Sequence, residues 1–185
     1  NLSLLIISTV ITVYSFETYL EFGQKKTQDV EKIAKQLGIP FDKRKKMEVF
    51  NDLNKMGIVG YPNITPYHFN KSNGLSTTNG RIYPLGGISN ITTIIGNESG
   101  YYPIIETDEH GFNNPKGLYQ INKVDIVLTG DSFTEGYSVH ADETISAVLR
   151  KLGFNVISLG NGGNGPLIEL ATVKEYAEPL KPKIV

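Results

Sequence analysis

Ser132 is the residue whose type and position best fit covalent chemistry. It lies in the segment GDSFTEG at residues 130–136, directly after an apolar run at residues 124–128 that only one acidic residue interrupts. A short apolar run bounded by turn residues is typical of a strand in a parallel sheet, and open α/β sheets bind ligands just beyond the carboxyl ends of their strands. Ser132 is therefore expected where a nucleophile would sit, on a tight turn whose backbone N–H groups can stabilise an oxyanion.

The same segment also permits a purely structural interpretation. Ser132 and Glu135 have the spacing of a capping box, in which the serine hydroxyl only caps a helix. The segment differs from the G-x-S-x-G turn, because Asp131 precedes the serine and Gly136 follows it by four residues. A phosphate-binding P-loop is excluded, because no lysine follows the glycines.

A glycine-rich loop at residues 160–165 follows the next predicted strand, at residues 155–159. Its sequence GNGGNG matches the dinucleotide-binding pattern G-x-G-x-x-G. However, Pro166 directly after the loop is unusual for that motif, and the confirming acidic residue would fall after Val185. The other interpretation is that the loop brings bare backbone N–H groups beside the serine, because glycine permits close approach and positive φ.

The elements around these two loops alternate between strand and helix. Strands are expected at residues 124–128, 155–159 and 183–185, and helices at residues 142–152 and 166–178. Asp142 is the expected cap of the first helix. The apolar stripe of that helix comprises Ile145, Val148, Leu149 and Leu152. Alternation at this spacing predicts a parallel, doubly wound α/β sheet.

These residues resemble the SGNH or GDSL-type hydrolases over residues 124–185. GDSFTEG is similar to the first sequence block of that family, and the spacing to VISLGNGGNG is similar to that of the second. The resemblance implies a flavodoxin-like parallel sheet with helices on both faces, in which the first two strands are neighbours. It also implies that Ser132 is both nucleophile and oxyanion donor and that Gly163 is the second donor. No metal or organic cofactor is implied.

The remaining catalytic blocks of that family would follow the third strand, after Val185. They are the third-block asparagine and the Asp-x-x-His pair, which supplies the general base of the serine. Asp108-x-His110 resembles the upstream Asp-x-His of SGNH-like proteins that acetylate exopolysaccharide, so His110 is the alternative base. The other histidines are His68 and His140, and no histidine lies in a metal-ligand cluster.

Over a longer span, the chain also resembles a membrane-anchored bacterial subgroup of the family, in which a segment like TDEHGFNNP at residues 107–115 precedes the first block. Residues 1–16 carry no charge and fit a signal-anchor helix, with a buried amphipathic helix as the alternative. Because the chain lacks an initial methionine and its last strand is cut short, we expect a piece of a longer protein. Four segments are predicted: a transmembrane helix at residues 1–20, a helical linker at 21–57, an irregular segment with a β-hairpin at 58–121, and the SGNH-type part at 122–185. Within the linker, the apolar spacing over residues 30–37 predicts a helix that ends at Gly38, and a second helix is expected from about Asp42 to Gly57.

Composition limits the function classes further. With 185 residues, 39% of them hydrophobic and 20% charged, the chain can bury a core. A net charge of -1 gives no electrostatic basis for nucleic-acid binding, and the absence of cysteine excludes disulfides and thiol catalysis. The basic run at residues 43–46 is interpreted as a solvated first helical turn, with contact to anionic lipid as the alternative.

The expected function is that of a membrane-anchored serine esterase whose catalytic part lies on the periplasmic or extracytoplasmic side. An acylated small molecule or an O-acetylated envelope glycan is the expected substrate. Three alternatives stay open: an O-acyltransferase of the same fold, a non-catalytic glycan-binding accessory protein, and a nucleotide-binding domain. The sequence does not indicate the oligomeric state.

Overall fold

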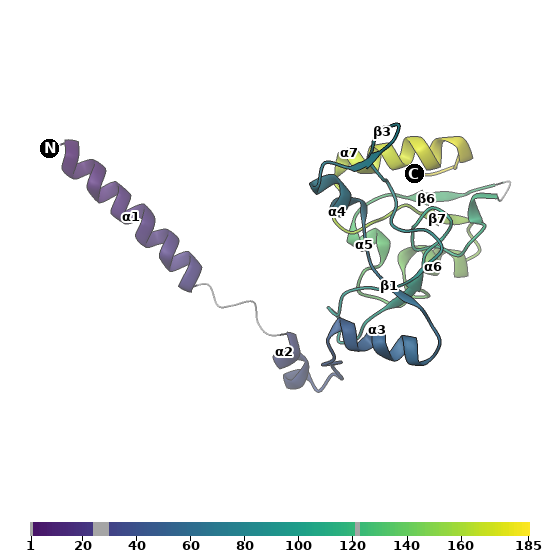
Figure 1. Cartoon of the computed structure of the whole chain (residues 1–185), viewed down its shortest axis with the longest axis horizontal. Helices are drawn as coiled ribbons and strands as arrows, with labels where there is room; N and C mark the ends of the chain where they lie inside the picture. The colour runs from purple at the N-terminus through teal and green to yellow at the C-terminus, as the bar shows by residue number, and fades with distance from the viewer. Residues whose placement is uncertain (1, 24–29, 121–122) are drawn as a thin grey trace. The chain divides into compact units, whose positions relative to one another are not determined.

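The computed structural model describes residues 2–23, 30–120 and 123–185, and Figure 1 labels its elements. The chain forms two compact units, Asn1–Phe41 and Asp42–Val185. The second unit contains both loops that carry the predicted chemistry, at residues 130–136 and 160–165.

The first unit contains a long apolar helix, α1 (Leu2–Gly23). Its span Leu2–Tyr19 has a mean hydropathy of 1.4 and no buried residue, so α1 is long and apolar enough to cross a membrane and is not a buried core helix. The hydroxyl groups of Ser8, Thr9, Thr12 and Thr18 donate to carbonyl groups one turn earlier, at 2.7–2.9 Å. These bonds satisfy polar groups within the helix, as an apolar surrounding requires.

The second helix of this unit, α2 (Val30–Leu37), has the predicted bounds. It ends where expected, because Gly38 adopts a φ of +68° that favours glycine.

The second unit begins with α3 (Lys46–Lys55), which packs on a three-stranded sheet. The sheet comprises β1 (Gly60–Pro62), β4 (Thr92–Ile94) and β5 (Ile104–Glu106), with β1 parallel and β5 antiparallel to the central β4. The β4–β5 pair confirms the predicted hairpin. Val49, Phe50 and Leu53 of α3 form a buried cluster with Ile94.

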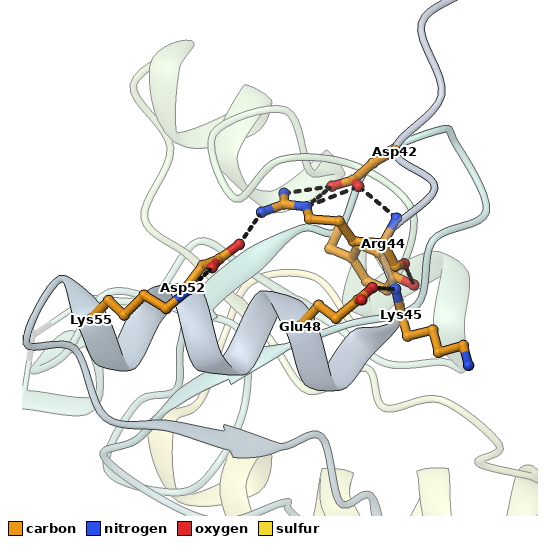
Figure 2. Close-up of polar contacts among 7 residues, drawn as sticks. Asp42, Arg44, Lys45, Glu48, Asp52 and Lys55 are labelled. Carbon is orange, nitrogen blue, oxygen red and sulfur yellow. Dashed lines mark hydrogen bonds and ion pairs between the residues drawn. The ribbon is translucent and has the colours of Figure 1, made fainter.

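The start of α3 is fixed by contacts that the sequence does not reveal, and it lies later than the expected start near Asp42. The Asp42 N–H donates to the Gly100 carbonyl oxygen at 2.7 Å, and the Tyr102 hydroxyl donates to the Arg44 carbonyl oxygen at 2.8 Å. Figure 2 shows the Arg44 guanidinium bridging the carboxylates of Asp42 and Asp52, at 2.6 and 2.8 Å. The segment before α3 is therefore extended along the hairpin, and the helix begins only at Lys46.

Between β1 and β4 the chain forms α4 (Pro66–Lys71) and an antiparallel pair, β2 (Leu75–Thr77) and β3 (Gly80–Ile82). The 3-10 turn η1 (Leu118–Gln120) follows β5. Pro66 occupies the first turn of α4, where its fixed φ suits a helix and its missing N–H costs no bond.

The predicted parallel strands form at β6 (Ile126–Leu128) and β7 (Val156–Ser158), which lie side by side in Figure 1. Ile184 joins the opposite edge of β6 through a parallel bridge, with the Val127 N–H donating to the Ile184 carbonyl oxygen at 2.9 Å. The strand at β6 therefore lies between β7 and Ile184, and the fold is mixed α/β. The core of this part consists of Phe112, Val124, Val127, Ile157, Leu159 and Ala177.

Three helices accompany these strands: α5 (Ser132–Glu135), α6 (Ile145–Lys151) and α7 (Pro166–Thr172). A π-helical turn η2 (Val173–Ala177) and a 3-10 turn η3 (Glu178–Leu180) continue α7, so helical structure extends slightly past the predicted end.

Two predictions about α6 are wrong. Thr144, not Asp142, is its N-cap, because the Thr144 hydroxyl accepts the Ala147 N–H at 3.1 Å. The predicted apolar stripe is exposed over most of its length, with Ile145 at 54%, Val148 at 46% and Leu152 at 69% exposure. The helix turns a different face inward, because the small residues Ser146 and Ala147 are buried and the Arg150 Nε donates to the Val156 carbonyl oxygen at 2.9 Å.

Candidate active site

Ser132 is the first residue of α5 and follows the carboxyl end of β6 through a tight turn. Gly130 in this turn has a φ of +154°, and a Cβ atom there would lie 2.3 Å from the Thr134 Oγ1. Asp131 is the N-cap, since its carboxylate accepts the Phe133 N–H at 3.0 Å. The capping-box interpretation of Ser132 is therefore wrong: its neighbour caps the helix, and no described residue bonds to the Ser132 hydroxyl.

The glycine loop at residues 160–165 lies directly beside this turn. A Cβ atom at Gly160 would lie 2.5 Å from the Glu135 backbone nitrogen, so only glycine permits this contact between the loop and α5. A Cβ atom at Gly162 would lie 3.9 Å from the Ser132 Cβ. Gly163 has a φ of +82° and packs against Tyr67, so the loop is also in contact with α4.

Two backbone donors of this site are unused. Within the described residues, neither the Ser132 N–H nor the Gly163 N–H donates to another group of the protein. Free N–H groups beside a serine hydroxyl are the components of an oxyanion hole.

Glu135 is a buried acid beneath the loop, with an exposure of 3%. Its Oε2 accepts the Gly162 N–H at 2.7 Å, and its Oε1 accepts the Asn63 Nδ2 at 3.3 Å. Burial raises the pKa of Glu135 to about 7, although both hydrogen bonds act in the opposite direction. The spacing of Glu135 from Ser132 predicted only a capping box, and no sequence signal indicated its contact with the loop.

Ser132 lines a cavity of about 400 Å³ together with residues from several distant segments. The other lining residues are Lys46, Asn63, Thr65, Tyr67, His68, Glu98, Tyr137, Gly162 and Gly163. Ser132 also lines a smaller cavity of about 310 Å³, which Phe133, Val139 and Ile145 make largely apolar.

The larger cavity contains a cation that the sequence analysis placed on a solvated helical turn. Lys46 is half-buried, and burial lowers its pKa. Among the described residues, no carboxylate forms an ion pair with Lys46. The carboxylate of Glu98, on the same cavity, accepts the Ser138 hydroxyl at 2.7 Å.

His68 is the histidine that lines this cavity, and no sequence pattern pointed to it. Its Nδ1 accepts the Thr65 N–H at 3.2 Å. A neutral imidazole that accepts through Nδ1 carries its proton on Nε2. In this geometry the Nε2 of His68 is therefore a hydrogen-bond donor rather than a proton acceptor.

His110, the alternative base, lines neither cavity of Ser132. Its ring packs against Tyr119 and Tyr176, with centroid distances of 4.4 and 5.0 Å. The Asp108 carboxylate accepts the backbone N–H groups of His110 and Phe112 at 2.8 and 2.9 Å. Asp108 thus stabilises a turn instead of orienting the imidazole, and this geometry does not support a catalytic Asp108–His110 pair.

The third histidine is also outside the site. His140 is exposed and stacks on Tyr101 at a centroid distance of 4.2 Å.

The segment at residues 107–115 is hydrogen-bonded to the elements that carry the site. The Asn113 Nδ2 donates to the Glu135 carbonyl oxygen at 2.8 Å, and the Asn114 Nδ2 donates to the Ser158 carbonyl oxygen at 2.8 Å. Both asparagines are buried, so the segment joins α5 to β7. The sequence pattern of this segment indicates neither of these contacts.

Comparison of the chain with protein-family models, with curated proteins and with solved structures finds no match.

Proposed function

We propose that this chain carries the nucleophile and two oxyanion donors of a serine acyl hydrolase of the SGNH type. One observation carries the proposal: Ser132 and Gly163 line the same cavity of about 400 Å³, and among the described residues the Ser132 hydroxyl and the backbone N–H groups of both residues have no partner. The volume is within the usual range for small-ligand sites.

In the proposed reaction the Ser132 Oγ attacks the carbonyl carbon of an ester and its proton passes to a general base. The Ser132 N–H and the Gly163 N–H donate to the oxyanion of the tetrahedral intermediate, and each such donor is typically worth about 10²–10³ in rate. Collapse of the intermediate expels the alcohol, which takes up a proton, and leaves an acyl-serine. Water then releases the acid and restores the hydroxyl. The described histidines offer no proton acceptor in contact with Ser132.

The arrangement of the strands supports the flavodoxin-like part of the proposal. Ile184, β6 and β7 pair in parallel with β6 in the centre, which places the first of the three strands between the second and third. In such sheets the ligand site lies beyond the carboxyl ends of the strands, where Ser132 follows β6.

An acylated glycan is the substrate class that we propose, with an O-acetylated envelope polymer as the specific candidate. The cavity combines two tyrosines, Tyr67 and Tyr137, with the polar side chains of Asn63 and Lys46. Aromatic side chains combined with a few polar groups are suited to binding a polar ligand such as a short glycan segment. The apolar helix α1 supports a membrane-anchored protein, with the Ser132 unit proposed on the extracytoplasmic side.

Two of the alternatives use this same cavity. An O-acyltransferase would pass the acyl group to a hydroxyl acceptor instead of water. A glycan-binding accessory protein would bind the same ligand without reaction at Ser132.

The nucleotide-binding alternative fits the loop less well. The carboxylate of Glu135 already accepts the Gly162 N–H, one of the donors that a phosphate would need. A negative charge at this position would also repel a phosphate.

Labelling of the full-length protein with a fluorophosphonate probe tests the proposal. We expect the wild-type protein and the variant Ser138→Ala to be labelled and the variant Ser132→Ala to remain unlabelled. Ser138 is a suitable control, because it lines the smaller cavity beside Ser132. A folded wild-type protein that is not labelled would overturn the proposal and favour the glycan-binding alternative.

A further inference from the structure

One short helix carries both Ser132 and the residue that fastens the glycine loop beside it. Glu135 is the last residue of α5, three positions after Ser132. Its carboxylate holds the loop through the Gly162 N–H at 2.7 Å. Gly163, the proposed oxyanion donor, is the next residue of the loop.

We propose that Glu135 is a positioning residue that holds the Gly163 N–H in register with Ser132, and that protonation of Glu135 adjusts this hold. The consequence for catalysis rests on the proposed hydrolase function. The contact between Glu135 and the loop does not, because it is a property of the fold.

The loop is held beside α5 at several points. The Asn161 N–H donates to the Gly130 carbonyl oxygen at 3.3 Å, and the Asn164 N–H donates to the Asn161 carbonyl oxygen at 3.1 Å. Gly160 lies against the backbone of α5 at Thr134 and Glu135, so the start of the loop is fixed by close packing. Among the described residues, the acceptor of the Gly162 backbone N–H is the Glu135 carboxylate. Losing this bond would remove the side-chain support at the residue next to Gly163, although the bonds at Asn161 and Asn164 would remain.

Asn63 holds the carboxylate itself in place. Its Nδ2 donates to the Glu135 Oε1 at 3.3 Å, so both carboxylate oxygens have a donor. Asn63 lies just before α4, whose residues Tyr67 and His68 line the cavity. The segment that holds the Glu135 carboxylate is therefore continuous with the cavity wall.

Titratable groups from several elements line the cavity next to Glu135. Lys46 at the start of α3, His68 of α4 and Glu98 of the β4–β5 connection line the adjoining cavity. Tyr137 follows α5, and the Glu135 charge contributes to the rise in its pKa after the effects of burial and Glu98. Because burial raises the pKa of Glu135 to about 7, its protonation changes near neutral pH.

The direction of the effect follows from hydrogen-bond strength. An ionised carboxylate accepts an N–H group more strongly than a neutral acid does. We therefore expect Gly162 to be held more firmly as pH rises through the pKa of Glu135.

The first measurement is the amide chemical shift of Gly162 in full-length protein with ¹⁵N-labelled glycine. In the wild type, this shift should titrate with a midpoint near the Glu135 pKa of about 7. In Glu135→Gln it should not titrate, because the amide keeps an acceptor without an ionisable group. A wild-type Gly162 shift that is constant across this range would overturn the proposal.

The second measurement is the rate of fluorophosphonate labelling. Glu135→Gln keeps both an acceptor for Gly162 and the side-chain volume, so its rate should stay within about threefold of the wild type. Glu135→Leu keeps the volume but not the acceptor, and its rate should fall about 10- to 100-fold, the equivalent of one hydrogen bond to a charged group. The control Glu175→Leu replaces an exposed acid outside both cavities of Ser132 and should be labelled at the wild-type rate.

The two measurements separate the positioning role from the hydrolase function. If no variant is labelled while Gly162 still titrates, the hydrolase proposal fails and the contact stands. If Glu135→Leu is labelled as fast as the wild type, the positioning role is wrong. Should Glu135→Leu fail to fold, Glu135→Asp provides the test, because its carboxylate is one methylene too short to reach Gly162. A wild-type labelling rate in that variant would also overturn the proposal.

Discussion

The side-chain amide of Asn114 pairs with both backbone groups of Ser158. Its Nδ2 donates to the Ser158 carbonyl oxygen at 2.8 Å, and its Oδ1 accepts the Ser158 N–H at 2.9 Å. The amide thus replaces a neighbouring strand along part of the edge of β7. The Asn114 Nδ2 also donates to the buried carboxylate of Asp108, at 2.8 Å. One side chain therefore connects the segment before the site to the strand that leads into the glycine loop.

Replacing Asn114 should lower stability. In Asn114→Ala the buried N–H and C=O of Ser158 lose their partner, and each unsatisfied group costs about 1–3 kcal/mol. We expect the free energy of unfolding, measured by urea denaturation, to fall by about 2–4 kcal/mol. The control Asn51→Ala changes an exposed residue of α3 and should change it by less than about 0.5 kcal/mol. Equal stability of the two variants would contradict the structural role of Asn114.

Two glycines of the same loop should respond differently to alanine. In Gly163→Ala the new Cβ lies 2.9 Å from the Tyr67 Cβ, at a φ of +82° that alanine adopts with strain. We expect a loss of about 1–2 kcal/mol in stability. Displacement of the oxyanion donor should also lower the labelling rate by about tenfold or more.

Gly165→Ala is the matched control for that change. Gly165 has a φ of -126°, and nothing lies within 4 Å of a Cβ atom there. Stability and labelling should both stay close to the wild type. Equal labelling of Gly163→Ala and Gly165→Ala would argue against the oxyanion role of Gly163.

The buried acid makes stability depend on pH in a defined direction. The pKa of Glu135 is raised from 4.5 to about 7, so folding favours its protonated form. Its contribution to stability is fully present below the unfolded pKa and is lost as pH rises through the folded pKa. The loss amounts to about 3 kcal/mol for a shift of this size.

Urea denaturation of the wild type and Glu135→Gln at about pH 5 and about pH 8 measures this contribution. The stability of the wild type relative to the variant should fall between the two pH values. Asp108, whose pKa is also raised by burial, is present in both proteins, and its effect cancels in the difference. An unchanged difference would mean that Glu135 ionises at its ordinary pKa.

The histidines provide a fourth prediction. His110→Phe should be labelled at the wild-type rate, because the ring of His110 packs against Tyr119 and Tyr176 and lies outside the cavities of Ser132. His68→Ala should slow labelling by less than about tenfold, since removal of a general base costs about 10²–10⁴. If His110→Phe were instead labelled about 10²- to 10⁴-fold more slowly than the wild type, the Asp108–His110 pair would be the catalytic base.

Local signals in the sequence predicted much of the backbone. The spacing of apolar residues gave the bounds of α2, and glycine at position 38 ended it. Short β-rich runs gave the β4–β5 hairpin and the two strands β6 and β7. These features depend on residues close together in the chain, whose periodicity and turn preferences act before any tertiary contact forms. For the same reason the sequence placed Ser132 after a strand and Gly163 after the next one.

The composition of the site was decided by tertiary structure. Lys46 and His68 lie far from Ser132 in the sequence, and only the packing of α3 and α4 against the site brings them to its cavity. Glu135 follows Ser132 at the spacing of a helix-capping acid. Its burial and its bond to the Gly162 N–H show that it supports the glycine loop instead. The apolar stripe on α6 had the correct period, but the face that packs is set by the neighbouring strand. Sequence patterns report which residues share a face, whereas burial and long-range hydrogen bonds determine which face, and which distant residue, completes the site.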